Sequence, residues 1–330
     1  MQRVKYLDTL RGLAILLVVF SHIYSGNRYM IYISIFNVPL FFIISGYLLK
    51  KNKEKYTKKN IKEIIKSKFK KLMIPYIIYG IMNIIGNYII SSNNVPELKN
   101  NIILFITLFG VGAMWFLPAL CIGEVGLIIL THSDKSINKI FYIILINLVF
   151  SISYYIFKEN YSWNLVFWII TRFIISFDFI VIGYYLYDII NNIREYKKYI
   201  ILILLILTYS LANFNGKISL WRVDFGKSIF LAIVLSICIC ILLIIIFRDI
   251  LNRDYKVLLW INKNSILILC THQMIIRLIG VSSESAVKCI IYVIITIFIE
   301  YLVIICLDFI KVANKKHKRY IEIKGENNYE

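Results

Sequence analysis

The chain has 330 residues, of which 59% are hydrophobic and 17% are charged, and its formal net charge is +19. So much apolar surface excludes a disordered chain, and the charged fraction lies well below the roughly 25% of soluble domains. A basic chain can be a nucleic-acid-binding protein, but here the charges avoid six long stretches. These stretches are residues 29–49, 72–96, 100–123, 140–157, 199–216 and 228–247. Because a helix of about 20 apolar residues crosses the hydrocarbon core of a bilayer, the sequence predicts a multi-pass membrane protein that binds no nucleic acid.

The apolar pattern predicts an all-α fold, a polytopic membrane bundle of about ten transmembrane helices. They are expected at residues 8–26, 31–49, 72–91, 112–131, 139–157, 164–187, 199–214, 227–247, 257–279 and 287–309. An even number of spans puts both termini on one side, and a cytoplasmic N-terminus leaves 27 basic residues inside and seven outside. This asymmetry follows the positive-inside rule. Both termini are therefore predicted to be cytoplasmic, in a protein of the cell membrane.

The predicted organisation is one integral-membrane domain, residues 1–310, with a basic cytoplasmic loop at 50–71 and a basic cytoplasmic tail at 311–330. The first span is expected to be retained, because Arg11 interrupts it and no small-residue cleavage site follows it. All six cysteines fall within spans and none has the spacing of metal ligands, so neither a disulfide framework nor a metal site is expected. Any chemistry must use side chains within the bundle or at its edge.

The first predicted helix carries Arg11 and His22 in an otherwise apolar sequence. Eleven residues turn a helix by about 20° more than three full turns, so the two side chains share one face and lie about 16 Å apart along the axis. Asp8 lies one turn before Arg11 and can pair with it or orient it. Ionisable residues inside a membrane are costly and mark functional sites. Arg11 and His22 are therefore the primary candidates, and the alternative for His22 is a hydrogen-bonded core residue.

The second predicted helix contains Ser45–Gly46, small residues that allow a neighbouring helix to approach closely. Ser45 is also a conceivable nucleophile, although no Gly-x-Ser-x-Gly elbow surrounds it. The following segment, residues 50–71, has eleven lysines and two glutamates. Attraction to anionic lipid head groups explains such a segment. The alternative is a surface for a polyanionic cytosolic cofactor such as coenzyme A, whose phosphates would meet Lys66, Lys68, Lys70 and Lys71.

The later helices supply further polar candidates. Glu124 lies in the fourth span with no charged residue within eight positions, so it must have a partner or be neutral. Arg172 lies near the middle of the sixth span. Glu124, Arg172 and His272 are candidates for orienting His22 or for binding an oxyanion, and Asn264 and Ser265 are further supporting candidates on the ninth span. The aromatic side chain of Trp115 is interpreted as an interfacial anchor.

Taken in order, these motifs resemble those of acyltransferase family 3, the membrane acyltransferases that modify bacterial surface polysaccharides. Leu7–Ala14 followed by His22 resembles the family's Arg-x10-His signature, and Val38–Tyr47 resembles its second block. The weaker similarities are Lys68 to Pro75–Tyr76, Trp115–Leu117, Gly183–Tyr185, Lys263–Ser265 and His272–Gln273. Three features depart from the family pattern: the basic run has lysine where arginine is frequent, Asn262 stands where glycine is usual, and Leu269 stands where a tyrosine often precedes the last histidine.

The resemblance implies an O-acyltransferase that moves an acyl group, usually acetyl, from cytosolic acyl-CoA to a hydroxyl of a cell-envelope or lipid-linked carbohydrate. His22 would be the general base, Arg11 with Asp8 would position the donor, and lysines 68, 70 and 71 would bind its phosphates. An acyl-His or acyl-Ser intermediate is an alternative. Two other functions are open: a polysaccharide exporter or transporter whose intramembrane charges line a polar path, and a non-enzymatic scaffold of the cell envelope.

Overall fold

A computed structural model describes residues 4–26, 29–53, 60–132, 165–193 and 197–326 of the protein, with side chains as far as residue 310. The described residues form helices and no strand, which confirms the all-α prediction. The helices are α1 Lys5–Ile23, α2 Met30–Phe36, α3 Pro39–Lys51, α5 Ile61–Ile90, α6 Val95–Ile106, the 3-10 helix η1 Gly112–Trp115, α7 Phe116–His132, α9 Leu165–Asn192, α10 Lys197–Asn215, α11 Ile229–Asp249, α12 Lys256–Lys263, α13 Ser265–Ile279 and α14 Ala286–Glu326.

Eight of the predicted spans coincide with described helical segments that are long and apolar enough to cross a membrane. These segments are Lys5–Ile23, Met30–Lys51, Ile61–Ile90, Gly112–Thr131, Leu165–Asn192, Lys198–Asn215, Ile229–Asp249 and Ala286–Ile310. The predicted span at 139–157 lies outside the described residues. The chain is thus a multi-pass membrane protein, while its total of ten spans and the side of its termini stay predictions.

The ninth predicted span, residues 257–279, is not one helix but two, α12 and α13, which meet at Asn264. The Asn264 side chain donates a hydrogen bond to the carbonyl of Trp260 at 3.0 Å. A side-chain amide that bonds the backbone in this way competes with the helical hydrogen bonds and favours a break. The 15-residue α13 is about 22 Å long, which is shorter than the hydrocarbon core of about 30 Å.

Helix α5 begins at Ile61, well before the predicted start of the third span at residue 72. Asn60 caps it by accepting a hydrogen bond from the backbone N–H of Lys62 at 3.1 Å. The second half of the segment expected to be a loop, residues 61–71, is therefore helical, and its lysines have fixed directions around α5. Helix α6, which the apolar pattern did not predict, pairs with α5 through a hydrogen bond of 2.7 Å from the Tyr76 hydroxyl to the Phe105 carbonyl.

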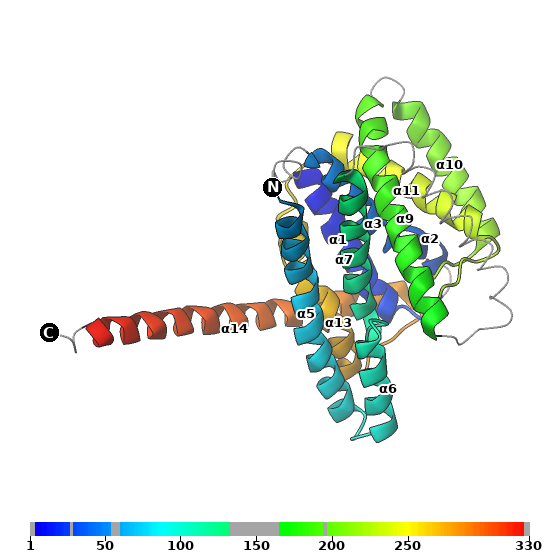
Figure 1. Ribbon diagram of the computed structural model, residues 1–330. Coiled ribbons are helices and arrows are strands. Elements are labelled where there is room, and N and C mark those ends of the chain that lie inside the picture. The colour runs from blue at the N-terminus through cyan, green and yellow to red at the C-terminus, as the bar shows by residue number, and fades with distance from the viewer. Residues whose placement is uncertain (1–3, 27–28, 54–59, 133–164, 194–196, 327–330) are drawn as a thin grey trace.

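Helices α1, α3, α7 and α9 lie side by side in the middle of the molecule, with α5 against α7 and α10 against α11 (Figure 1). Glycines allow the closest of these approaches, between α3 and α9. A Cβ atom on Gly46 would lie 1.8 Å from the carbonyl oxygen of Ile180, and one on Gly183 would lie 2.0 Å from that of Ile43. The predicted close packing at Ser45–Gly46 is confirmed, and it is reciprocal.

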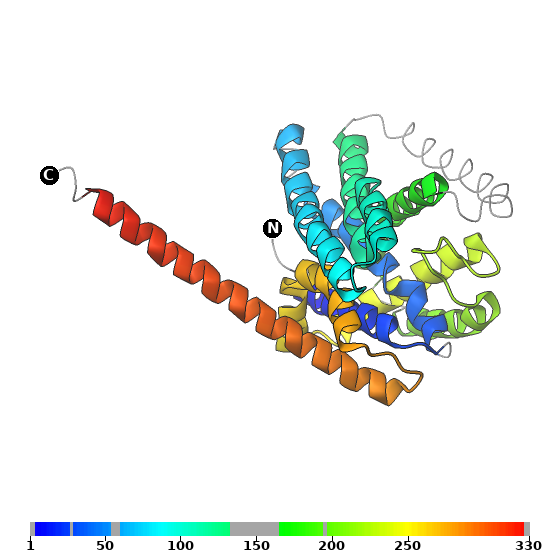
Figure 2. The same cartoon turned by 90° about the horizontal axis from the view of Figure 1, so that it is seen from below.

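Helix α14 begins against α13 and α1 and then runs outward, away from the other helices, in both views of the molecule (Figures 1 and 2). Its backbone continues as one helix to Glu326, so most of the expected tail at 311–330 extends this last span. Many of its apolar side chains between Val287 and Ile310 are exposed. Such a surface is suited to lipid rather than water.

Candidate active site

The two primary candidates, Arg11 and His22, lie toward opposite ends of the same continuous helix, α1. Their separation of about 16 Å along the axis and about 20° around it therefore holds in the folded protein. Each residue belongs to a different polar group of side chains. One group lies at the end of the molecule where α1 and α5 begin, and the other at the end where α1 finishes.

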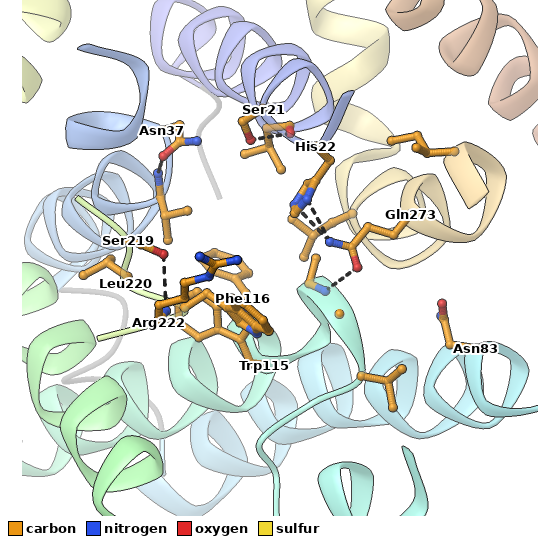
Figure 3. A pocket seen from close by; sticks show the side chains of 18 of the residues that line it. Ser21, His22, Asn37, Asn83, Trp115, Phe116, Ser219, Leu220, Arg222 and Gln273 are labelled. Atoms are coloured by element: carbon orange, nitrogen blue, oxygen red, sulfur yellow. Dashed lines mark hydrogen bonds between the residues drawn. The ribbon is translucent and has the colours of Figure 1, made fainter. Parts of the chain in front are cut away.

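The side chain of His22 lines a cavity of about 710 Å³ at the C-terminal end of α1. Its side chain is exposed, and the surface that it exposes lines this cavity. The walls come from α1, α2, the start of α3, α5, α6, η1, the start of α7, α13 and the loop before α11 (Figure 3). The polar lining includes six side-chain amides, those of Asn37, Asn83, Asn87, Asn100, Asn101 and Gln273, and five charged side chains, those of Glu97, Lys217, Arg222, Asp224 and Arg277. Val18, one helical turn from His22 toward Arg11, also lines the cavity.

Gln273 and His272 contact the ring of His22 from α13. The Nε2 atom of Gln273 lies 3.0 Å from each ring nitrogen of His22, and its Oε1 accepts a hydrogen bond from the backbone N–H of Ala113 at 3.0 Å. The ring centroids of His22 and His272 are 5.1 Å apart. His272 is fully buried, and its Nδ1 lies 2.8 Å from the carbonyl oxygen of Ile268. A carbonyl only accepts, so Nδ1 carries the proton and Nε2 presents a lone pair.

The second polar group surrounds Glu124 of α7. Its carboxylate forms an ion pair of 2.8 Å with Lys68 of α5 and accepts a hydrogen bond from Ser45 of α3. Arg11 and Lys71 both lie within electrostatic range of Glu124. Helices α1, α3, α5 and α7 thus bring together five residues that the sequence suggested as candidates: Arg11, Ser45, Lys68, Lys71 and Glu124. This arrangement supplies the partner that an intramembrane carboxylate was expected to need.

Lys70 does not belong to this group, although it was expected to bind phosphate beside Lys68 and Lys71. Two residues turn a helix by about 200°, which places Lys70 on the side of α5 opposite Lys68, whereas Lys71 at about 300° stays near it. Lys70 is accordingly exposed. Asp8, expected to orient Arg11, accepts a hydrogen bond of 3.0 Å from the amide of Asn262 on α12. Asn262, which stands where glycine is usual in the family, thus links α12 to α1.

Arg172 is buried away from His22, although it was a candidate for orienting that ring. Its guanidinium donates to the carbonyl of Phe109 at 3.2 Å and to that of Trp221. The guanidinium also lies 3.8 Å from the ring centroid of Phe109 and 5.2 Å from that of Trp115. Trp115 is buried and lines the cavity, so its interpretation as an interfacial anchor is wrong. Arg172 holds two segments of the cavity wall together.

Asn264 and Ser265 lie at the start of α13, about two turns before His272 and Gln273. Neither is among the described residues that line the cavity. Their position indicates that they shape the junction of α12 and α13 instead of contacting His22.

Sequence reasoning missed the amides that line the cavity, because a single asparagine in an apolar helix carries no charge to attract attention. The spacing of Asn83 and Asn87 was an available signal, since residues four apart share a helix face. It also missed Glu300 of α14, which is fully buried and lies 2.7 Å from the hydroxyl of Thr271. A carboxylate within a predicted span was a direct signal for this residue.

The comparisons with known proteins identify the family of the chain. A family model described as an acyltransferase domain, that of acyltransferase family 3, matches residues 4–307. No curated protein and no solved structure matches the chain. The match covers all the helices that form both polar groups. The chain is therefore a member of acyltransferase family 3, a membrane acyltransferase.

Proposed function

We propose that the protein transfers an acyl group, specifically acetyl, from cytosolic acyl-CoA to a hydroxyl of a cell-envelope or lipid-linked carbohydrate. The observation that carries the proposal is the placement of His22 in a polar cavity at one end of α1, with Arg11 in a basic group near the other end. Family membership supplies the class of reaction. The two polar groups supply separate places for donor and acceptor.

The cavity around His22 suits a carbohydrate acceptor. Sugar hydroxyls both donate and accept hydrogen bonds, and so do the side-chain amides of the lining. The Nδ2 atom of Asn101 is buried and has no hydrogen-bond partner among the described residues, so it can donate to a ligand. Trp115 and Trp221 add flat apolar surfaces. A volume of about 710 Å³ falls in the range of small-molecule sites.

The group around Glu124 suits the phosphates of the donor. Arg11, Lys68 and Lys71 supply positive charge on facing helices, and charged donors form the strongest hydrogen bonds to phosphate. Glu124 holds Lys68 in place through the ion pair, and Ser45 holds Glu124 through its hydrogen bond. The distance of about 16 Å from Arg11 to His22 is comparable with the length of an extended pantetheine arm. The thioester would then reach the cavity while the nucleotide stays at the cytoplasmic end.

In the proposed reaction His22 accepts the proton of the acceptor hydroxyl as the oxygen attacks the thioester carbonyl. The bond between the acyl carbon and sulfur then breaks, an ester forms, and the coenzyme A thiolate leaves and takes up the proton from His22. A neutral imidazole is needed at the start, and an ordinary histidine is largely neutral at pH 7. No metal is required in this sequence of steps.

The test is acyl transfer from radiolabelled acetyl-CoA to the envelope glycan fraction in membranes that contain the full chain. We expect His22→Ala to lower the rate at least about 100-fold, the usual contribution of a general base. His132→Ala, which removes a histidine from the end of α7, is the matched control and should keep the rate. Transfer at the normal rate by His22→Ala refutes the proposed role of His22. Absence of transfer and of acetyl-CoA hydrolysis in the unaltered protein supports an exporter.

A further inference from the structure

Gln273 is fixed between the η1 turn and His22, and its hydrogen bonds determine the direction of its amide. The Oε1 atom accepts from the backbone N–H of Ala113 at 3.0 Å. If the oxygen and nitrogen were exchanged, two donors would face each other at this contact. The Nε2 atom must therefore face His22, where it lies 3.0 Å from both ring nitrogens.

The amide direction constrains the protonation state of His22. Nε2 of Gln273 only donates, and a neutral imidazole offers it a lone pair at one of the two ring nitrogens that it contacts, so this contact favours neutral His22. An imidazolium has an N–H on both nitrogens and would meet the amide N–H with another donor. This contact thus favours the form of His22 that a general base needs at the start of the reaction.

A glycine makes this contact possible. Gly112 has φ +60, and a Cβ atom built on it would lie 1.8 Å from Oε1 of Gln273. Any other residue at position 112 would displace the amide from Ala113, and with it the donor that faces His22. Because the backbone approaches the amide directly, the geometry does not depend on a flexible side chain in η1.

We propose that Gln273 is the positioning residue of His22: its amide, fixed by the N–H of Ala113, keeps the imidazole neutral by donating to its lone pair until an acceptor hydroxyl takes that place. The inference rests on the proposed function, because it takes His22 to be the base. On acceptor binding, the hydroxyl donates to the lone pair that Gln273 occupied, and its proton passes to His22 during attack. Gln273 itself takes up no proton and forms no bond to the substrate carbon.

Other charged or titratable groups also face this part of the molecule, and they are the same in all the variants compared. They are His272 and Arg277 of α13, Glu97 of α6, Glu300 of α14, and Lys217, Arg222 and Asp224 of the loop before α11. A difference between the pH profiles of two variants at position 273 therefore reports on that position.

The first experiment compares the pH dependence of acetyl transfer for the unaltered protein and Gln273→Glu, using membranes and radiolabelled acetyl-CoA at a concentration below KM. A carboxylate at position 273 still accepts from Ala113 but faces His22 as an acceptor, so it favours the imidazolium. The acid limb of the profile should move to higher pH by about one unit or more, with most of the rate restored at high pH. Gln273→Met fills the same space without a donor or a charge and should also move the limb to higher pH; if Gln273 only filled space, Gln273→Met would leave the limb where it is.

The second experiment is a double-mutant cycle between Gly112 and Gln273. Gly112→Ala should lower the rate at least about tenfold in the unaltered protein, but less than about twofold in Gln273→Ala, because no amide remains to be displaced. Gly280→Ala is the matched control, since Gly280 has φ +68 and no atom within 4 Å of its Cβ position. Equal losses from Gly112→Ala in both backgrounds would mean that only backbone strain matters, which overturns the coupling.

The two proposals fail in different ways. If His22→Ala is inactive while Gln273→Glu has an unchanged acid limb and the cycle shows no coupling, the role of Gln273 is refuted and the proposed function stands. If His22→Ala transfers acetyl groups normally, the proposed function fails first. The amount of each variant in the membrane fraction, measured by immunoblot, normalises the rates.

Discussion

The ammonium group of Lys68 lies 2.8 Å from the carboxylate of Glu124, joining α5 to α7 where both side chains are mostly buried. A cation and an anion removed from water attract each other strongly, but the loss of either leaves an uncompensated charge. The ion pair can therefore have two roles in the protein. It stabilises the helix packing, and it holds a cation where an incoming phosphate would meet it.

Two variants separate the structural role of the pair from its role in donor binding. Lys68→Ala leaves the buried Glu124 without its ion-pair partner and should destabilise the fold by about 3–5 kcal/mol. The double variant Lys68→Met with Glu124→Gln removes both charges and should restore the yield of folded protein. It should still show a KM for acetyl-CoA raised at least about tenfold, since a lost charged hydrogen bond costs about 1.5–3 kcal/mol.

The control for this set is Lys70→Ala, which removes an exposed lysine from the opposite side of α5. We expect a KM for acetyl-CoA within about twofold of that of the unaltered protein, because surface charges contribute little. An equal rise in KM for Lys70→Ala and the double variant would indicate a diffuse electrostatic effect instead of a defined phosphate site.

Arg11→Lys should raise the KM for acetyl-CoA at least about tenfold, because a lysine keeps the charge but cannot bind a phosphate through two parallel hydrogen bonds. The Nε atom of Arg11 is buried and has no hydrogen-bond partner among the described residues, so the guanidinium has donor capacity available. The measurement is the initial rate of transfer as a function of acetyl-CoA concentration. Arg253→Lys, at an exposed loop position, serves as the control, and a normal KM for Arg11→Lys contradicts donor binding by Arg11.

The accuracy of the predicted spans follows the strength of the local signal. The uncharged run at 228–247 became α11, Ile229–Asp249, almost at its predicted bounds. The expected single span at 257–279 broke because the local hydrogen bond of Asn264 to the Trp260 carbonyl competes with the helix. The four consecutive polar residues Asn262–Ser265 interrupt the apolar pattern at this break, and they were an available signal that the apolar content of the whole span obscured.

Only the part of the candidate site that lies on a single helix could be predicted from the sequence. Arg11 and His22 share a face of α1 because of the helical period alone. The ion pair of Lys68 with Glu124 joins residues 56 positions apart on two helices, and no local pattern specifies which faces of α5 and α7 meet. Gln273 reaches His22 across 251 positions, so its role emerges only from the packing of α13 against α1.

Close packing of α3 against α9 should depend on Gly46 and Gly183. An added methyl group at either position would overlap a carbonyl oxygen of the facing helix at 2.0 Å or less, so Gly46→Ala and Gly183→Ala should each lower the midpoint of thermal unfolding in detergent by several degrees. Gly126→Ala on α7 is the control, because its Cβ would meet only the side chain of Phe177, at 3.2 Å. Unchanged unfolding of both tight variants would contradict the helix spacing.

Arg172 connects the two halves of the cavity wall, so its loss should affect the acceptor more than the donor. Its guanidinium donates hydrogen bonds to the carbonyls of both Phe109 and Trp221. The single ammonium of Arg172→Lys cannot make both hydrogen bonds and also stack on the Phe109 ring. We expect the KM for the glycan acceptor to rise at least about tenfold, with acetyl-CoA hydrolysis in the absence of acceptor nearly unchanged. Rates measured with acetyl-CoA alone and with added glycan fraction distinguish the two effects. Equal losses in both assays would mean that Arg172 stabilises the whole bundle and has no specific effect on the acceptor site, because a misfolded protein loses its donor site together with its acceptor site.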